Sequence, residues 1–211
     1  MSFLEQKTGL LLKFECLKCG TCCHEYEFAD DTSIKRIPVF PEELEKLEKY
    51  ATEHDVKIKF LEDVVFPDLK NEKILVITYK IILEGKEKCC PFFLASCGCR
   101  VNDFKPLACK AYPLAQKKVD AYHTTMDLDP YCKFIEKNEE QVKNCSQQDL
   151  ISSFPAEFLQ SKLLMEKNQE IILVLKQLTF QGKISIPDTV STDQMNKWLL
   201  SWEREFLDGL N

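Results

Sequence analysis

Apolar residues recur with two different periods in the first half of the chain, which predicts a mixture of helices and strands. Residues 41–54 begin with Pro-Glu-Glu, which is typical of a helix start, and continue with apolar side chains at helical spacing. One face of this helix carries Leu44, Leu47 and Tyr50. Residues 74–83 are rich in β-branched side chains and predict a strand, with which residues 119–125 are expected to pair. Shorter extended pieces are expected at residues 11–15, 25–28 and 34–40.

The pattern is almost wholly helical from about Phe134 to the end of the chain. Residues 155–180 predict one long helix closed by Gly182, and a last helix is expected to begin at Ser191, which forms a capping-box signature with Gln194. The expected core positions of the long helix are Phe158, Leu159, Leu163, Ile172, Leu175 and Leu178. The last helix is expected to carry Met195, Trp198, Leu199, Trp202 and Phe206 on one packing stripe.

Together these elements predict an α+β fold, with a small cysteine-rich core of short strands and helices and a helical C-terminal extension. The thiols concentrate before the helical part, so we expect a cysteine-cluster domain over residues 1–133 and a helical subdomain over residues 134–211. A chain of 211 residues is long enough to bury such a core without disulfide staples.

Charge and hydropathy exclude several classes of protein. The formal net charge is −6, which argues against a general nucleic-acid binder, because neutralising phosphates requires a basic surface. The apolar stretch Leu10-Leu11-Leu12 is too short for a signal peptide, and the densest apolar run, residues 171–175, is far shorter than the ~20 residues of a membrane-spanning helix. We therefore expect a soluble cytoplasmic protein.

The chain contains 11 cysteines, an odd number, and most of them are clustered. In a reducing compartment such thiols stay reduced, so their clustering indicates metal binding or reactivity rather than disulfides. Buried cysteines can also act as small apolar residues, but that role does not explain ligand-like spacing.

The first cluster reads Cys16-Leu-Lys-Cys19-Gly20-Thr-Cys22-Cys23. Two residues between cysteines let successive thiolates converge on one centre, and the glycine permits a tight turn. Neighbouring side chains usually diverge, so the adjacent pair Cys22-Cys23 suggests either a second centre or one cysteine with a supporting or redox role. Remote ligands are also expected, and residues 89–132 supply further cysteines.

These residues resemble the CxxCxxCC cysteine-cluster family, whose members are described as chelators of zinc or iron and which includes the flagellin lysine methylase. The leading C-x-x-C-G-x-C-C motif is matched in full by residues 16–23. A cysteine followed by Phe-Leu falls on Cys90 with Phe93-Leu94, a third motif falls on residues 99–113, and a late cysteine corresponds to Cys132. Where the family has arginines, this chain has Lys105 and Lys110, which do not offer the same bidentate fork.

The resemblance implies eight metal ligands: Cys16, Cys19, Cys22, Cys23, Cys90, Cys99, Cys109 and Cys132. Eight thiolates are twice what one tetrahedral ion or one cubane cluster takes, so either two centres exist or several of the eight support the others. Cys89, Cys97 and Cys145 fall on no motif and are interpreted as bystanders.

Residues 86–118 contain seven basic side chains against two acidic ones. Cations near a tetrathiolate centre would offset its negative charge and lower thiol pKa values. A solvated basic face or a site for an anionic substrate would give the same pattern.

Three functions remain open at this point. The first is a protein that holds an iron–sulfur cluster or a zinc ion, of which we favour the cluster because the spacing of Cys16, Cys19 and Cys22 is similar to ferredoxin ligation. The second, implied only by the resemblance, is an enzyme like the lysine methylase; no G-x-G-x-x-G site for S-adenosylmethionine is present. The third is a zinc-stabilised module that binds a protein partner, and no catalytic residue is assigned in any of the three.

Overall fold

A computed structural model describes residues 12–24, 37–83, 85 and 88–207 of the chain. Its helices are η1 (Thr21–Cys23), α1 (Pro41–Glu53), η2 (Asn102–Phe104), α2 (Leu107–Ala111), α3 (Lys133–Lys137), α4 (Glu139–Lys143), α5 (Gln147–Ser153), α6 (Pro155–Phe180) and α7 (Thr192–Ser201). Its strands are β1 (Pro38–Val39), β2 (Phe60–Asp68), β3 (Lys73–Ile81), β4 (Phe93–Leu94), β5 (Gly98–Cys99), β6 (Leu114–Lys118), β7 (Thr124–Leu128) and β8 (Glu203–Phe206). The α+β fold class is confirmed.

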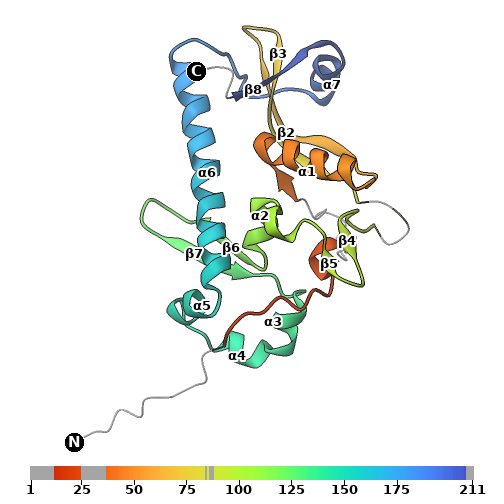
Figure 1. Ribbon diagram of the computed structural model, residues 1–211. Coiled ribbons are helices and arrows are strands. Elements are labelled where there is room, and N and C mark those ends of the chain that lie inside the picture. Colours follow the sequence, from red (N-terminus) through yellow and green to blue (C-terminus); the bar gives the residue numbers. More distant parts are fainter. Residues whose placement is uncertain (1–11, 25–36, 84, 86–87, 208–211) are drawn as a thin grey trace, which may run out of the picture.

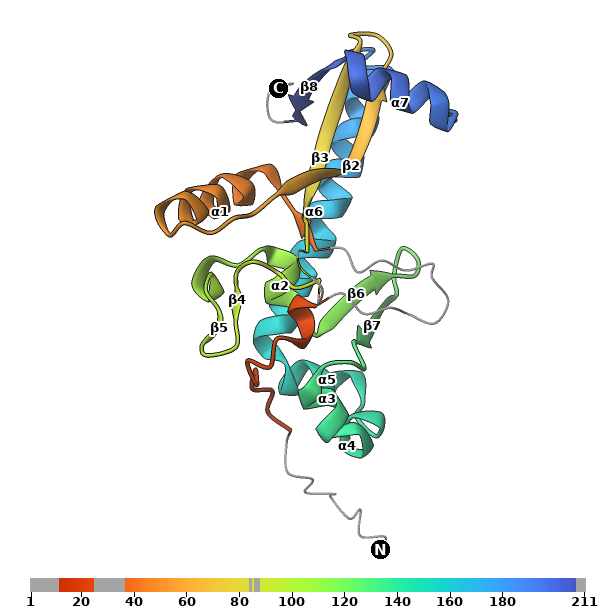
Figure 2. The ribbon, with the colours of Figure 1, turned by 90° about the vertical axis from the view of Figure 1, so that its right-hand side faces the viewer.

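Strand β3 is the centre of the main sheet. It pairs antiparallel with β2 along most of its length, antiparallel with β1 at its end, and parallel with β8 at its start. Most of its β-branched and leucine side chains are buried, and Leu75 and Ile77 among them pack against α6. Figures 1 and 2 show this sheet at one end of an elongated molecule, with α3, α4 and α5 at the other end and α6 running between them.

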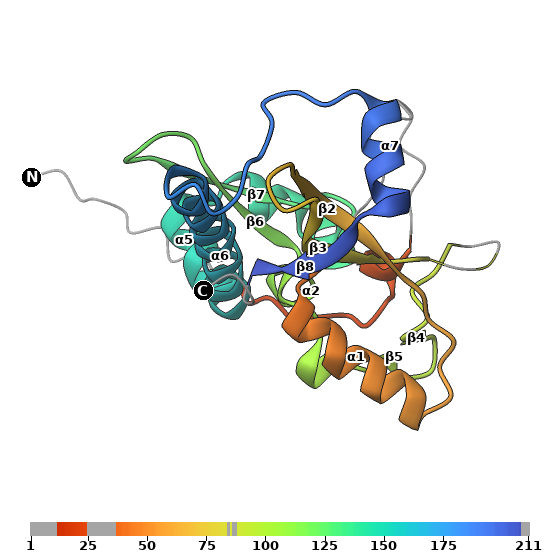
Figure 3. The ribbon, with the colours of Figure 1, turned by 90° about the horizontal axis from the view of Figure 1, so that it is seen from above.

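Three hydrophobic cores follow from this arrangement. The first joins the end of β3 to α1 and to the segment after Cys89: Val39, Leu47, Ala51, Ile81, Cys90, Phe92 and Val101. The second packs the start of β3 on the C-terminal end of α6: Leu75, Ile77, Leu175, Leu178 and Ile184. The third lies at the other end of α6: Leu114, Cys132, Phe134, Ile135 and Phe154. Figure 3, which views α6 nearly end-on, shows the helix beside the sheet.

Local sequence signals predicted the helices well. The helix at residues 41–54 is α1, the long helix is α6, and the strand at residues 74–83 is β3, so these three predictions are confirmed. Gly182 follows α6 with a left-handed backbone (φ 65°), as its role in closing the helix requires. Ser191 caps α7, because its hydroxyl accepts a hydrogen bond from the Gln194 N–H.

Predictions that depended on long-range pairing were often wrong. Residues 119–125 do not pair with β3; residues 119–123 form the turn of the β6–β7 hairpin, in which Lys118 lies opposite Thr124. Residues 12–15 form no strand, and residues 25–28 and 34–36 lie outside the described residues. The extended piece expected at residues 34–40 is confirmed in part, because it contains β1. The stripe predicted for the last helix is also wrong, because α7 ends at Ser201 and Phe206 lies in β8.

The core of α6 is smaller than its pattern predicted. Leu175 and Leu178 are buried, but Leu159, Leu163 and Ile172 are exposed. The reason is that α6 links two separate cores, so only part of its apolar surface meets a neighbour. None of the helices that the structure describes is long and apolar enough to span a membrane.

The expected boundary at residue 134 falls within a core, not between two cores. Phe134 and Ile135, just after it, pack with Leu114 and Cys132, just before it. The division into residues 1–133 and 134–211 therefore stays a prediction, and any separation of the two parts would divide this core.

The buried carboxylate of Asp68 fastens the turn between β2 and β3 to the segment after α6. Its oxygens accept hydrogen bonds from the N–H groups of Lys70 (3.0 Å) and Ser185 (2.8 Å) and from the side-chain amide of Asn71. The N–H of Leu69 in turn donates to the carbonyl oxygen of Ser185 (2.8 Å). One side chain thus connects the sheet to the end of the second core.

We expect Asp68→Ala to lower the free energy of unfolding by about 2–3 kcal/mol, because it removes a buried carboxylate that accepts three partly buried hydrogen bonds. Urea denaturation followed by circular dichroism measures this change. Asp188→Ala, at an exposed carboxylate nearby in the sequence, serves as the matched control and should change the unfolding free energy little. Equal effects of the two substitutions would contradict the role given to Asp68.

Candidate metal centre

The first cysteine cluster lies on an irregular segment that ends in a tight turn. Residues 12–19 form neither helix nor strand, and the short helix η1 follows them. Phe14 fixes the start of this segment: its ring lies 5.1 Å from those of Phe134 and Phe154, and its N–H donates to the Ser153 carbonyl (2.9 Å). The N–H of Cys23 donates to the carbonyl oxygen of Gly20 (2.7 Å), which closes the turn.

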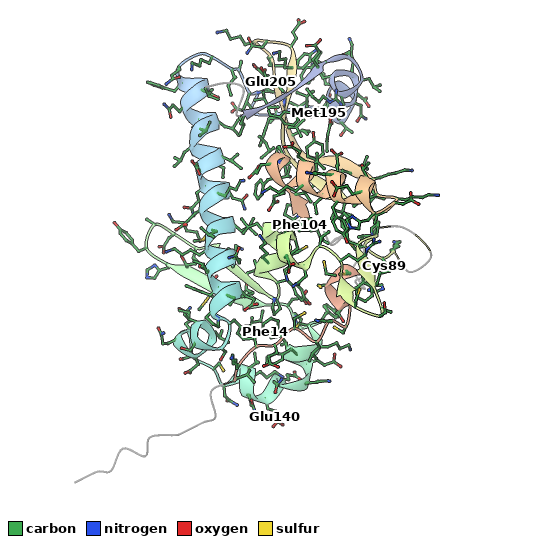
Figure 4. The ribbon with its side chains drawn as sticks, in the orientation of Figure 1. Phe14, Cys89, Phe104, Glu140, Met195 and Glu205 are labelled. Atoms are coloured by element: carbon green, nitrogen blue, oxygen red, sulfur yellow. The ribbon has the colours of Figure 1, made fainter. Side chains whose placement is uncertain are left out.

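A backbone pairing joins this cluster to the second group of cysteines. The N–H of Cys90 donates to the carbonyl oxygen of Cys23 (2.7 Å), and His24 forms an antiparallel bridge with Cys89. The chain then turns into the β4–β5 hairpin, in which Phe93 lies opposite Cys99. Figure 4 labels Cys89 at the start of this hairpin.

Two glycines let these segments approach each other closely. Gly20 has a left-handed backbone (φ 79°), and a Cβ atom there would lie 2.3 Å from the ring of Phe93. Gly98 is also left-handed (φ 84°), and a Cβ atom there would lie 3.1 Å from the Cβ of Lys18. The glycine of the leading motif is therefore needed both for its conformation and for contact with the Phe-Leu motif.

Two short helices carry the remaining motif cysteines. Cys109 lies in α2, whose start is fixed by Glu43: one carboxylate oxygen accepts from the N–H of Leu107 (2.7 Å) and the other from the N–H of Phe40 (2.9 Å). Cys132 is buried at the position that precedes α3. Three parts of the fold thus present cysteines to the region around η1.

A cavity of about 160 Å³ lies where these segments meet. Nine cysteines line it, namely Cys16, Cys19, Cys22, Cys23, Cys90, Cys97, Cys99, Cys109 and Cys132. All eight predicted ligands are in this set, whereas Cys89 and Cys145 are not. Cys97, interpreted as a bystander, also lines the cavity; its spacing from Cys99 was the one sequence signal that could have indicated it.

The lining thiols differ in exposure. Cys90 and Cys132 are buried, Cys22, Cys23, Cys99 and Cys109 are partly buried, and Cys16, Cys19 and Cys97 are exposed. Among the described residues, no three His, Cys, Asp or Glu side chains are already arranged to hold a metal ion. The thiols share one cavity, and ligation would require their side chains to turn toward a common point.

Burial and mutual repulsion hold the inner thiols in their protonated form. Burial raises the pKa of Cys90 to about 12, and the backbone N–H of Phe92 offsets part of this effect. Burial also raises the pKa values of Cys99 and Cys109, and nearby thiolates add to the rise. The charge of Cys22 contributes to the raised pKa of each of these three cysteines and of Cys23, so Cys22 lies near all four.

Cys16, Cys19 and Cys132 are the remaining motif thiols that line the cavity. Burial raises the pKa of Cys132, the N–H groups of Ile135 and Phe134 partly offset this, and the charge of Cys19 adds to the rise. The charge of Cys16 contributes to the raised pKa of Cys99. Cys19 therefore lies near Cys132, and Cys16 lies near Cys99.

Three lysines among the described residues line the cavity, namely Lys18, Lys105 and Lys133, of which Lys133 forms an ion pair with Glu136 (2.6 Å). Of these only Lys105 belongs to the basic stretch at residues 86–118, and it lowers the pKa values of Cys99 and Cys109. Arg100 from that stretch lies over the ring of Tyr50 instead, 5.7 Å from its centre. Sequence analysis missed Lys18 and Lys133, because only the fold brings them to the cavity.

The family comparison is consistent with this geometry. A family model named CxxCxxCC, described as "Putative zinc- or iron-chelating domain", matches residues 15–156. The chain belongs to the CxxCxxCC family. The comparisons with curated proteins and with solved structures give no match.

The donor set suits the metals that the CxxCxxCC family is described as chelating. Thiolates bind zinc and iron–sulfur clusters, whereas magnesium and calcium prefer oxygen ligands. The only carboxylate at the cavity among the described residues is that of Glu157, whose pKa burial raises. His24 does not line the cavity, and its ring Nδ1 bonds with the Gly20 carbonyl oxygen (2.8 Å).

We expect Gly20→Ala to destabilise the chain and to lower its metal content, because the new methyl group would collide with Phe93. Gly85→Ala is the matched control, since Gly85 has nearly the same backbone (φ 80°) but open space around its Cα. The control substitution should lower the free energy of unfolding by about 1–2 kcal/mol, from the strain of a left-handed backbone alone. Gly20→Ala should lower it by about 1–3 kcal/mol more, from overpacking against Phe93, and urea denaturation measures both changes. Equal costs would show that Phe93 does not constrain Gly20.

Proposed function

We propose that this chain binds an iron–sulfur cluster through the inner thiolates Cys22, Cys90, Cys99 and Cys109. The observation that carries this proposal is the cavity, which is lined by cysteines from three parts of the fold, with Cys22 near Cys90, Cys99 and Cys109. These four thiolates come from η1, from the segment that pairs with it, from β5 and from α2. Four thiolates are the usual number for one cluster.

The size of the cavity supports a cluster over a single ion. A zinc ion sits ~2.3 Å from each of four sulfur atoms and needs little space beyond them. One water molecule needs roughly 10–15 Å³ of such space, so a cavity of about 160 Å³ has room for several atoms. The ferredoxin-like spacing of Cys16, Cys19 and Cys22 gives less support to a cluster than the cavity does, because Cys16 and Cys19 are exposed while Cys22 is partly buried.

The protein would contribute to such a centre in three ways. The inner thiolates would hold the iron, and Lys105 would offset part of their negative charge. Apolar side chains, among them Phe92, Val101 and Phe134, line the same cavity and would limit access of water. When bound, an iron–sulfur cluster supplies one-electron redox chemistry.

Zinc is the alternative occupant, because the same thiolates would satisfy a closed tetrahedral site. Anaerobic purification from iron-replete cells decides between the two. We expect brown protein that contains iron and sulfide, with broad visible absorption that bleaches on reduction by dithionite. Colourless protein with one zinc ion per chain would overturn the iron proposal and leave the thiolate site in place.

The ligand assignment is tested by serine substitution. We expect Cys22→Ser, Cys90→Ser, Cys99→Ser and Cys109→Ser each to abolish binding of the inner metal and to destabilise the chain, because thiolate bonds contribute to folding free energy. Metal per chain, from elemental analysis of anaerobically prepared protein, measures the loss.

Three cysteines outside the family motifs serve as controls for these variants. Cys89→Ser and Cys145→Ser should keep the wild-type metal content, because neither side chain lines the cavity. Cys97→Ser should also keep it, although Cys97 lies at the cavity. Loss of metal in Cys89→Ser with retention in Cys90→Ser would show that the two adjacent positions have been assigned the wrong way round.

A further inference from the structure

The β6–β7 hairpin reaches out beside α6 and, among the described residues, forms a sheet of two strands only (Figures 1 and 2). The strands pair along their whole length without a register shift. The outer edge of β6 meets α6, because the N–H of Gln116 donates to the Ser161 hydroxyl (2.8 Å). The other edge of the hairpin is the outer edge of β7.

The pairing within the hairpin fixes which backbone groups of β7 point away from β6. The N–H of Asp129 donates to the carbonyl oxygen of Pro113 (2.9 Å), and bonded positions alternate along an antiparallel pair. The N–H and C=O groups of Thr124, Met126 and Leu128 are therefore directed outwards. Among the described residues, no hydrogen-bond partner meets them on that side.

The outer edge of β7 lacks the features that usually prevent an exposed strand from pairing. Natural edge strands are protected by proline, by lysine or by a bulge. Strand β2, at an edge of the main sheet, contains Pro67 and two register shifts. Strand β7 reads Thr-Thr-Met-Asp-Leu and pairs regularly, so its outward backbone groups are open to a further strand.

The charges beside this edge are complementary to those of a second copy. Antiparallel pairing of two β7 strands about a two-fold axis at Met126 places Thr125 opposite the partner's Asp127. Lys117 lies opposite Thr125 on the other side, so Lys117 and the partner's Asp127 would flank one threonine. Both side chains are exposed, and neither forms an ion pair with another described residue. The two-fold axis brings these opposite charges together twice.

We propose that the outer edge of β7 is a dimer interface, through which two copies of this chain form one sheet of four strands. Met126 would pair with the partner's Met126, and Thr124 with the partner's Leu128, each opposed pair exchanging two backbone hydrogen bonds. The contact is small, so the dimer is weak and reversible. The hairpin lies between Cys109 and Cys132 in the chain, so the sheet would connect the cysteine-bearing parts of two copies. The proposal does not depend on which metal is bound.

Sedimentation velocity of the full-length chain, over a wide range of concentration and with a phosphine reductant to prevent disulfides, tests the interface. Thr124→Pro removes an outward N–H and should weaken dimerisation about tenfold or more. Lys118→Pro is the matched control, because Lys118 lies opposite Thr124 and its N–H points to the other edge. It should change dimerisation little, and circular dichroism establishes that both variants are folded.

Charge reversal tests the two-fold register without altering the backbone. Lys117→Asp and Asp127→Lys should each weaken dimerisation about tenfold, because like charges replace both pairs. The double variant Lys117→Asp/Asp127→Lys restores opposite charges and should dimerise nearly as well as the wild type.

The remaining outcomes overturn the proposal in different ways. A wild-type chain that stays monomeric at every concentration would leave the edge to a different protein. A dimer that resists both Thr124→Pro and Asp127→Lys would have its interface elsewhere. A double variant no tighter than the single ones would exclude the two-fold register. Should Thr124→Pro fail to fold, the exposed charge variants decide alone.

Discussion

The hydrogen bond from the Cys90 N–H to the Cys23 carbonyl oxygen is the contact on which the thiol cavity depends. It joins two short segments that are far apart in the sequence and that form no extended sheet with each other. Bringing them together costs loop entropy, which grows slowly with the length of the intervening chain. Packing of Phe93 on Gly20 and burial of Phe92 in the first core offset this cost, so protein contacts contribute to assembling the cavity.

The surroundings in the assembled cavity oppose ionisation of its thiols. Each inner thiol is desolvated, and each would repel the charge of its neighbours, so the free thiols retain their protons near neutral pH. Thiolates are the form that binds metal, so a metal ion must displace these protons and supply the charge that the surroundings lack. Lys105 lowers the pKa values of Cys99 and Cys109, and a bound metal would add its own positive charge to that of Lys105.

Local signals in the sequence predicted α1, α6 and the cap at Ser191, because capping residues and helical spacing act within a few positions. They did not predict β2, β8 or the β6–β7 hairpin, whose strands are specified by pairing across the sheet. For the site, motif spacing identified eight cysteines that line one cavity, but it could not separate ligands from supporting thiols. The exposure of Cys16 and Cys19 and the position of Lys133 follow from the fold alone.

The cavity lies between two of the three cores, which gives its occupant a structural effect beyond the site. Ile81, Phe92 and Val101 from the first core line one part of it, and Cys132 and Phe134 from the third core line another. No buried residue of the second core lines it. A metal held by Cys90 and Cys99 on one side and by Cys109 in α2 on the other would add bonds across a region that is otherwise joined by short loops. The start of β3 and the C-terminal end of α6, which form the second core, would gain little from those bonds, so the stabilisation given by the metal should be local to the cysteine-bearing segments.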